Sequence, residues 1–176
     1  MRIVLTGARG FMGWHTRLRL HALTDHEVVP VGREEWADLA GLVRGADAVI
    51  HIAGVNRARD EEGGLSADEQ VNQGNVQLAQ DLAAAVTAAR KPVRVVYANS
   101  IQAGNGTPYG AGKQEAGQVL REAVEAAGGH LTEVILPNLF GEHCTPYYNS
   151  FTATFIDKVV NGEEPTINDN PVNLLH

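Results

Sequence analysis

The sequence has little cysteine, an excess of acid over base, and no long apolar run. Cys144 is the only cysteine among the 176 residues, which excludes an internal disulfide framework and a zinc site built from several cysteines. Lysine and arginine number 14 against 21 acidic residues, giving a formal net charge of −7, unlike the basic balance of nucleic-acid binders. No stretch approaches the roughly 18 apolar residues of a membrane span. We therefore expect a cytoplasmic protein with no nucleic-acid or membrane partner.

What the sequence does contain is an alternation of short β-branched runs with longer helical patterns. Strands are predicted over residues 2–6, 27–31, 48–53, 94–98 and 131–136, and helices over 11–23, 36–44, 66–90 and 109–127. Short strands separated by helices predict parallel pairing, hence an α/β fold with a doubly wound, mostly parallel sheet of the Rossmann type. We expect residues 1–140 to form a dinucleotide-binding domain and 141–176 to begin a small substrate-binding lobe.

Three glycines at three-residue spacing follow the first predicted strand and open the first predicted helix. In a dinucleotide-binding loop, residues such as Gly7, Gly10 and Gly13 allow a tight turn, close approach of backbone N–H groups to a pyrophosphate, and close helix–strand packing. The helix N-terminus adds partial positive charge for the phosphates. A plain glycine turn is the alternative, but the strand–loop–helix context favours a cofactor site.

The second predicted strand ends in Gly32-Arg33, with no carboxylate where an NAD site usually binds the ribose hydroxyls. Arg33, together with Arg9 in the glycine loop, suits a 2′-phosphate through charge-assisted hydrogen bonds, which favours NADP (NADPH) over NAD. The alternative is that both arginines are solvated surface charges. Asp38-Leu39 is a candidate contact for the adenine edge, although Asp38 alternatively caps the following helix.

Ser100, Tyr109 and Lys113 form a pattern suited to hydride transfer at a carbinol carbon. Tyr109 and Lys113 stand four residues apart, on one face of a predicted helix, and Ser100 follows the strand at 94–98. A tyrosine exchanges a proton with the substrate oxygen if its phenol is more acidic than usual, and we expect the Lys113 ammonium to lower the pKa of Tyr109. Ser100 would hold the substrate oxygen by a hydrogen bond. Taken alone, the Tyr–Lys spacing is common and usually structural.

Further segments match a known family in their order along nearly the whole chain. They are Thr6-Gly-Ala-Arg-Gly-Phe-Met-Gly13, His51-Ile-Ala-Gly54, Asn75-Val76, Ser100, Tyr109-Gly-Ala-Gly-Lys113 and Leu136-Pro-Asn-Leu-Phe-Gly141. In these segments the chain resembles the extended short-chain dehydrogenase/reductases, the NAD-dependent epimerase/dehydratase family of nucleotide-sugar enzymes. Within that family, Ala53-Gly-Val-Asn-Arg57, Gln102-Ala103 and Tyr148-Asn-Ser-Phe-Thr-Ala-Thr-Phe155 are similar to CapF-type ketoreductases of capsular polysaccharide synthesis. Those enzymes use NADPH to reduce a UDP-linked 4-keto-6-deoxy amino sugar.

The resemblance implies a role for each matching residue. Tyr109 is the expected acid/base, Lys113 its activator, and Ser100 the donor to the substrate oxygen. Together with the residues considered above, the resemblance predicts cofactor contacts from Gly7, Arg9, Gly10, Phe11, Met12, Gly13, Arg33, Asp38, Leu39, Ile52, Ala53, Gly54, Asn75, Asn99, Tyr109, Lys113, Pro137 and Asn138. Substrate contacts are expected from Asn56, Gln102, Asn138 and Asn149, and no metal is expected.

Some positions depart from the family pattern. Ile135 stands where many relatives have an arginine, and Ile101-Gln102 replaces the acidic pair of the dehydratase branch, so dehydration lacks an acid and a base. CapF-type proteins continue through the rest of a substrate-binding region and a cupin domain, so the resemblance implies a truncated chain. His143 and Cys144 suit proton transfer at a sugar carbon, or are a surface histidine beside a small buried hydrophobe.

The leading hypothesis is an NADPH-dependent reductase of a nucleotide-linked 4-keto-6-deoxy sugar. A nucleotide-sugar 4-epimerase that retains its NAD(P) would use the same Ser100, Tyr109 and Lys113, and a non-catalytic NADP-binding sensor or scaffold is a third hypothesis. The expected partners are a nucleotide-sugar substrate and, from the family resemblance, a second copy of the chain in a homodimer.

Overall fold

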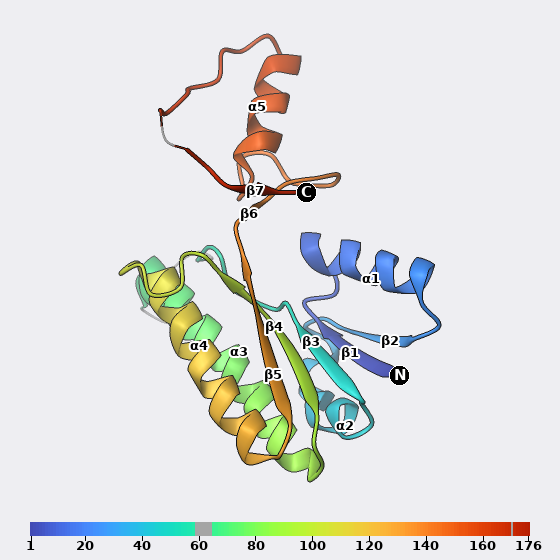
Figure 1. Cartoon of the computed structure of the whole chain (residues 1–176). Coiled ribbons are helices and arrows are strands. Elements are labelled where there is room, and N and C mark those ends of the chain that lie inside the picture. The colour runs from blue at the N-terminus through green and yellow to red at the C-terminus, as the bar shows by residue number, and fades with distance from the viewer. Residues whose placement is uncertain (59–64, 170) are drawn as a thin grey trace. The chain divides into compact units, whose positions relative to one another are not determined.

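The computed structural model describes residues 1–58, 65–169 and 171–176, which form two compact units, Met1–Ile135 and Leu136–His176. The first unit contains β1 (Arg2–Thr6), α1 (Phe11–Leu23), β2 (Glu27–Val31), the 3₁₀ turn η1 (Glu35–Asp38), α2 (Leu39–Arg44), β3 (Ala48–His51), α3 (Ala67–Ala89), β4 (Arg94–Ser100), α4 (Pro108–Ala126) and β5 (His130–Leu136), the last residue of which belongs to the second unit. Figure 1 shows the course of these elements along the chain.

The strands of the first unit form one sheet in the order β2-β1-β3-β4-β5, and β1 pairs in parallel with both β2 and β3. β3 and β4 are parallel as well. This arrangement confirms the predicted Rossmann-type fold. From β1 the chain first adds a strand on one side and then returns to the other side, so the strand order reverses between β1 and β3. Ligands of doubly wound sheets bind at such a switch point, outside the carboxyl ends of the strands.

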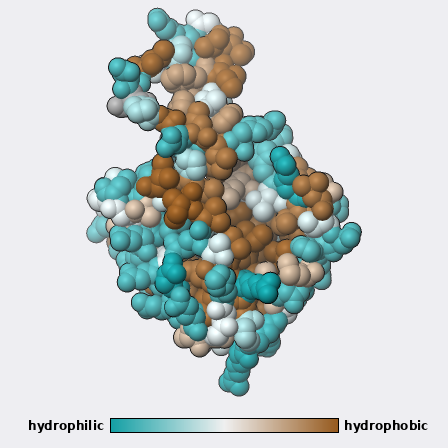
Figure 2. Space-filling view, viewed as in Figure 1, coloured by the Kyte–Doolittle hydropathy of each residue, from teal (hydrophilic) through white to brown (hydrophobic). Residues whose placement is uncertain are grey.

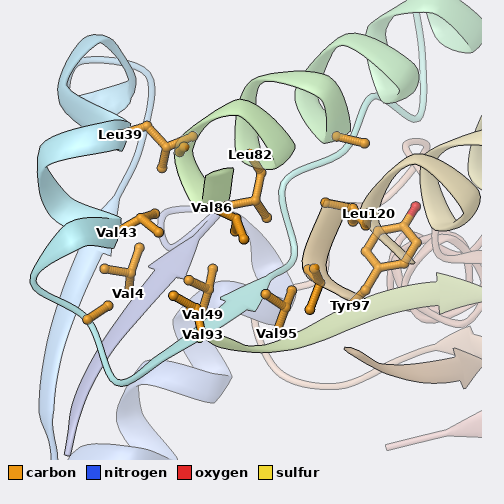
Figure 3. Packing of buried hydrophobic residues seen from close by; sticks show 14 of the residues in the cluster. Val4, Leu39, Val43, Val49, Leu82, Val86, Val93, Val95, Tyr97 and Leu120 are labelled. Atoms are coloured by element: carbon orange, nitrogen blue, oxygen red, sulfur yellow. The ribbon is translucent and has the colours of Figure 1, made fainter. Parts of the chain in front are cut away.

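The hydrophobic core lies between the sheet and the layer formed by α2, α3 and α4, while α1 lies on the opposite face (Figure 1). Alternate residues of each strand point into this core, because successive side chains of a strand face opposite sides. Figure 3 shows Val49, Val95 and Tyr97 of the sheet facing Leu82 of α3 and Leu120 of α4. The core therefore fixes β3 and β4, the strands that carry the family motifs, against α3 and α4.

The helix starts follow local capping rules. Ser66 and Glu69 form a reciprocal capping box at the start of α3. At the start of α4, the Thr107 hydroxyl accepts the Gly110 N–H at 3.0 Å, and Pro108 occupies the first turn, where it costs no hydrogen bond. These caps determine where α4 begins, and thereby where Tyr109 and Lys113 lie.

Two strand ends differ from the prediction. β4 continues to Ser100, two residues beyond the predicted end, so Ser100 is the last residue of the strand. β3 ends at His51 rather than at residue 53, because the N–H groups of Ile52 and Ala53 donate to the Thr6 hydroxyl at 3.2 and 3.3 Å instead of continuing the ladder. The predicted helix at 36–44 is divided into η1 and α2.

The second unit contains β6 (Asn138–Leu139), α5 (Phe151–Val160) and β7 (Leu174–Leu175), none of which was predicted. β6 and β7 pair in parallel. Several apolar side chains of α5 are exposed, including Ile156, Val159 and Val160, and Figure 2 shows hydrophobic residues gathered there. The assignment of these residues to a substrate-binding lobe stays a prediction. Among the residues that the structure describes, no helix is long and apolar enough to cross a membrane.

Candidate active site

The glycine loop begins at the carboxyl end of β1 and lies against the end of β3. Gly7 has a φ of +68°, which disfavours residues with a side chain, and a Cβ at this position would lie 2.7 Å from the Ala53 backbone nitrogen. The loop therefore contacts the chain of Ile52 and Ala53 without any intervening side chain. This is the switch point of the sheet, where the family resemblance places the cofactor.

The other two loop glycines have different reasons for lacking a side chain. A Cβ at Gly13 would collide with the Gly7 carbonyl oxygen and come within 2.7 Å of the Ala8 Cα, so Gly13 allows α1 to pack against the loop. Gly10 has a φ of −79°, and its Cβ would make an ordinary contact at 3.4 Å with the same carbonyl oxygen. The fold itself does not require glycine at position 10, and close approach of a cofactor stays the predicted reason for it.

The first turn of α1 fits the pyrophosphate of a dinucleotide. Ser66, Thr107 and Ser150 cap the starts of α3, α4 and α5, whereas no described side chain caps α1, and its first turn holds no acidic residue. The backbone N–H groups there suit an anion, since they add to the positive end of the helix dipole. The donor set of the loop is thus appropriate for a nicotinamide dinucleotide.

A buried hydrogen-bond network joins the ends of β1 and β3 beneath this loop. The Thr6 hydroxyl accepts the N–H groups of Ile52 and Ala53 and lies 2.8 Å from His51 Nδ1. Because both of its lone pairs accept, its proton points at Nδ1, and the His51 proton lies on Nε2. Burial, together with the charge of Lys113, lowers the pKa of His51 to about 3, so the ring is neutral near neutrality. His51 is a fixed structural acceptor.

Ser100, Tyr109 and Lys113 come together at the carboxyl end of β4. The half-buried Tyr109, in the first turn of α4, lies close enough to Ser100 for the serine side chain to affect its pKa. The prediction that its phenol is more acidic than usual is wrong for this structure. Burial raises the pKa of Tyr109, and the Ser100 side chain lowers it only in part. Tyr109 is therefore protonated near neutral pH.

The ammonium group of Lys113 is buried and directed at the end of β4. Its side chain is 5% exposed, and Nζ donates to the Ala98 carbonyl oxygen at 2.7 Å. Nζ also lies 4.2 Å from the centre of the Tyr97 ring, a cation–π distance. Burial lowers the pKa of Lys113 to about 8, against a smaller, opposite effect from Glu133. The ammonium is thus charged near neutrality and loses its proton just above that range.

The end of β2 holds acidic groups that the sequence did not place there. A Glu35 carboxylate oxygen accepts the Gly32 N–H at 2.8 Å, and Arg9 pairs with Glu35 at 2.7 Å and with Glu34 at 3.4 Å. The expectation of no carboxylate at this strand end is corrected, because η1 turns Glu35 back onto Gly32. The Gly32 N–H, with Arg9 contributing, lowers the pKa of Glu35. Arg33 is exposed beside this cluster.

Several other predicted residues have structural partners of their own. The Asn75 amide donates to the Val55 and Val71 carbonyls, both at 2.7 Å, and accepts the Val55 N–H at 3.2 Å. Asn75 therefore holds the loop after β3 in place. Leu39 is 4% exposed and belongs to the core (Figure 3), while Asp38 is exposed and makes no side-chain cap to α2 within the described structure.

The remaining predicted residues lie in loops or in the second unit. Asn56 and Gln102 are exposed after β3 and β4. Pro137, Asn138, His143, Cys144 and Asn149 belong to the second unit. Among the described residues no group of three or more histidine, cysteine or acidic side chains is placed to hold a metal. Sequence reasoning gave no role to Tyr97, Glu35 or Glu133, although a charged residue inside an otherwise apolar strand at 131–136 is a usable signal for Glu133.

The strand order and the glycine loop at its switch point define a dinucleotide-binding fold of the Rossmann type. The model of the NAD dependent epimerase/dehydratase family matches residues 3–173, and the chain belongs to that family. It is also 33% identical over 171 residues to the UDP-2-acetamido-2,6-beta-L-arabino-hexul-4-ose reductase of Pseudomonas aeruginosa, covering 97% of this chain and 44% of that protein.

Solved structures show the same relationship. The capsular polysaccharide assembling protein CapF from Staphylococcus aureus matches with a TM-score of 0.75 and 34% identity, over 99% of this chain and 45% of that one. A UDP-glucuronic acid 4-epimerase from Bacillus cereus, in complex with UDP-glucuronic acid and NAD, matches with a TM-score of 0.77 over 93% of this chain and 64% of that one. At 17% identity, that likeness concerns the fold alone. The chain spans less than half the length of the reductase and of CapF.

Replacement by alanine should have different effects at Gly10 and at Gly13. We expect Gly13→Ala to lower the free energy of unfolding by roughly 1–3 kcal/mol, because the new Cβ collides with backbone. Gly10→Ala should leave that free energy unchanged and weaken dinucleotide binding by roughly tenfold. Chemical denaturation and fluorescence titration with NADPH check the pair. Equal stability losses in both variants would contradict this division of roles.

The buried Lys113 gives the stability a particular pH dependence. Its pKa is about 8 in the fold against an ordinary value of 10.5, so between these values the unfolded chain binds more protons than the native protein. The free energy of unfolding should therefore gain a contribution that rises with pH through this window, on the order of 3 kcal/mol in total. Denaturation of Lys113→Met across this pH range should lack the rise, and Lys91→Met should keep it. The same dependence of the unfolding free energy on pH in Lys113→Met and Lys91→Met would refute its assignment to Lys113.

Proposed function

We propose that the protein is an NADPH-dependent reductase of a nucleotide-linked 4-keto-6-deoxy sugar. The observation that carries the proposal is that Ser100, Tyr109 and the buried Lys113 ammonium come together at the carboxyl end of a strand next to the switch point. The name of the Pseudomonas reductase supports the choice of a 4-keto sugar as substrate. Since the chain covers less than half of that relative, the activity is a proposal for this chain.

Tyr109, Ser100 and Lys113 have different roles in the reduction of a carbonyl group. When bound, the nicotinamide cofactor supplies the hydride that the carbonyl carbon receives. Tyr109 supplies the proton to the carbonyl oxygen, and its raised pKa suits this direction because the phenol begins protonated. Ser100 donates a hydrogen bond to the same oxygen as negative charge develops there. The Lys113 ammonium stabilises the phenolate that remains on Tyr109.

The choice of NADPH rests on the two arginines near the end of β2. Arg9 and Arg33 would pair with a 2′-phosphate, and Arg9 would then exchange its contacts with Glu34 and Glu35 for that phosphate. Glu35 opposes this preference, because its carboxylate lies at the same strand end and repels a phosphate. The balance between these charges sets the ratio of the two affinities.

For location and assembly we propose a cytoplasmic homodimer. The support is the family resemblance, in which subunits pair through the helices around the Tyr-x-x-x-Lys segment, and the presence of a single cysteine. Light scattering of the purified protein measures the assembly directly, and a mass of one chain at micromolar concentration would contradict it.

Turnover tests the reaction. We expect the protein to consume NADPH stoichiometrically with a UDP-linked 4-keto-6-deoxy sugar, and Tyr109→Phe to lower kcat by roughly 10²–10⁴. The matched control is Tyr147→Phe, since Tyr147 is 54% exposed and bonds Asp157 on α5. Sugar conversion with no net change in the cofactor would instead indicate an epimerase, and unaffected turnover in Tyr109→Phe would remove the catalytic assignment.

Cofactor choice is tested at the end of β2. Arg9→Ala should weaken NADPH binding by roughly tenfold or more, because it removes a charged hydrogen bond, and leave NADH binding unchanged. Glu35→Gln should shift the preference further towards NADPH. Calorimetric titration with both cofactors measures each ratio. Equal affinity of the unaltered protein for NADH and NADPH would contradict the assignment.

A further inference from the structure

A chain of polar contacts lies behind the catalytic residues, between β4, β5 and α4. Glu133 on β5 accepts the Asn99 side-chain N–H at 2.8 Å with one carboxylate oxygen and pairs with Arg121 of α4 through the other. The Glu133 side chain is 19% exposed, whereas that of Arg121 is 50% exposed. A charged and largely buried carboxylate is thus held on β5 and directed at the layer of α4.

Asn99 links Glu133 to Ser100 at the end of β4. Asn99 is 5% exposed. Its side-chain oxygen Oδ1 accepts the Ser100 N–H at 2.9 Å, while its side-chain nitrogen Nδ2 donates to Glu133. Gly117 of α4 provides the space, because a Cβ there would lie 3.2 Å from the Glu133 carboxylate and 3.3 Å from the Asn99 amide nitrogen. The orientation of Asn99 is therefore determined on both sides.

Three consecutive residues of β4 then serve the reacting groups. The Ala98 carbonyl holds the Lys113 ammonium, Asn99 is fixed by Glu133, and Ser100 lies next to Tyr109. A displacement of Asn99 moves both neighbours, since all three share one backbone segment.

Electrostatic interactions also link Glu133 and Arg121 to Lys113. Lys113 lies over the Tyr97 ring of β4 and one helical turn before Gly117, the α4 residue that faces Glu133 and Asn99. Its charge acts on the neutral His51 of β3, and the charge of Glu133 on β5 acts on Lys113. Of these, Glu133 favours the charged form of Lys113, in opposition to burial. Arg121 faces Glu133 and offsets part of its negative charge.

We propose that Glu133, held by Arg121, is a positioning residue that fixes the orientation of Ser100 through Asn99 and supplies the counter-charge of the Lys113 ammonium. The part concerning the reaction rests on the function proposed above. The part concerning Lys113 is independent of it and is measurable without substrate or cofactor.

The composition of the chain makes a direct measurement simple. Lys91, Lys113 and Lys158 are its only lysines, so NMR of protein with ¹³Cε-labelled lysine gives three titrating signals. Lys113→Arg identifies the signal of interest. Glu133→Gln keeps an acceptor for Asn99 and removes the charge, and we expect the Lys113 midpoint to fall by roughly half a unit to one unit. Arg121→Met should move the midpoint in the opposite direction.

The control is Glu125→Gln, which removes the other, exposed partner of Arg121, 3.9 Å away. It should leave both the Lys113 midpoint and the turnover unchanged. An unchanged midpoint in Glu133→Gln, or shifts of the same sign in Glu133→Gln and Arg121→Met, would overturn the proposal. Thermal unfolding of each variant shows that the comparison is made on folded protein.

Kinetics test the link to Ser100. In Glu133→Gln the alkaline limb of the kcat–pH profile should move to lower pH by the same amount as the NMR midpoint. Asn99→Ala, which removes the link between Glu133 and Ser100, should lower kcat several-fold. A lysine shift without any turnover would uphold the role of Glu133 and refute only the proposed reaction. An alkaline limb unmoved in Glu133→Gln would refute the counter-charge role in the reaction, and an unchanged kcat in Asn99→Ala would refute the positioning role.

Discussion

The hydroxyl of Thr6 joins the two strands on which the site depends. It ends the ladder of β3 by accepting the N–H groups of Ile52 and Ala53, and it fixes the tautomer of the buried His51. Because the loop after β3 is held in this way, Gly7 comes into direct contact with it, and the glycine loop takes its place at the reversal of strand order. The geometry that suits a dinucleotide thus follows from one buried side chain at the end of β1.

A second constraint is the cost of burying a positive charge. Lys113 has given up most of its hydration, and a backbone carbonyl, an aromatic face and a nearby carboxylate replace it only in part, which is why its pKa lies near 8. The same environment keeps the Tyr109 phenol protonated. A protonated phenol beside a charged ammonium is the starting state that a reduction needs, so the electrostatics of the site agree with the proposed direction of hydride transfer.

Local patterns predicted most of the fold, because strand and helix signals act over a few residues. β1, α1 and β2 begin and end where the sequence places them, and the predicted helices at 66–90 and 109–127 agree with α3 and α4 to within one residue at each end. Site residues were predictable where their chemistry requires a fixed spacing, as with Tyr109 and Lys113 on one face of a helix. The roles of Glu35 and Glu133 were not predicted, because both arise from contacts that a local pattern does not show. A turn brings Glu35 back to Gly32, and the sheet brings Glu133 to Asn99. β6 and β7 of the second unit hold two residues each, too few for any pattern.

The central claim is that this site delivers hydride to a keto sugar with Tyr109 as the proton donor. Its most direct test uses NADPH deuterated at the transferred position together with a UDP-linked 4-keto-6-deoxy sugar. The account predicts one deuterium at C4 of the product for each NADPH consumed, and loss of this transfer in Tyr109→Phe. Product without deuterium, or an epimerised sugar with the cofactor unchanged, would contradict it.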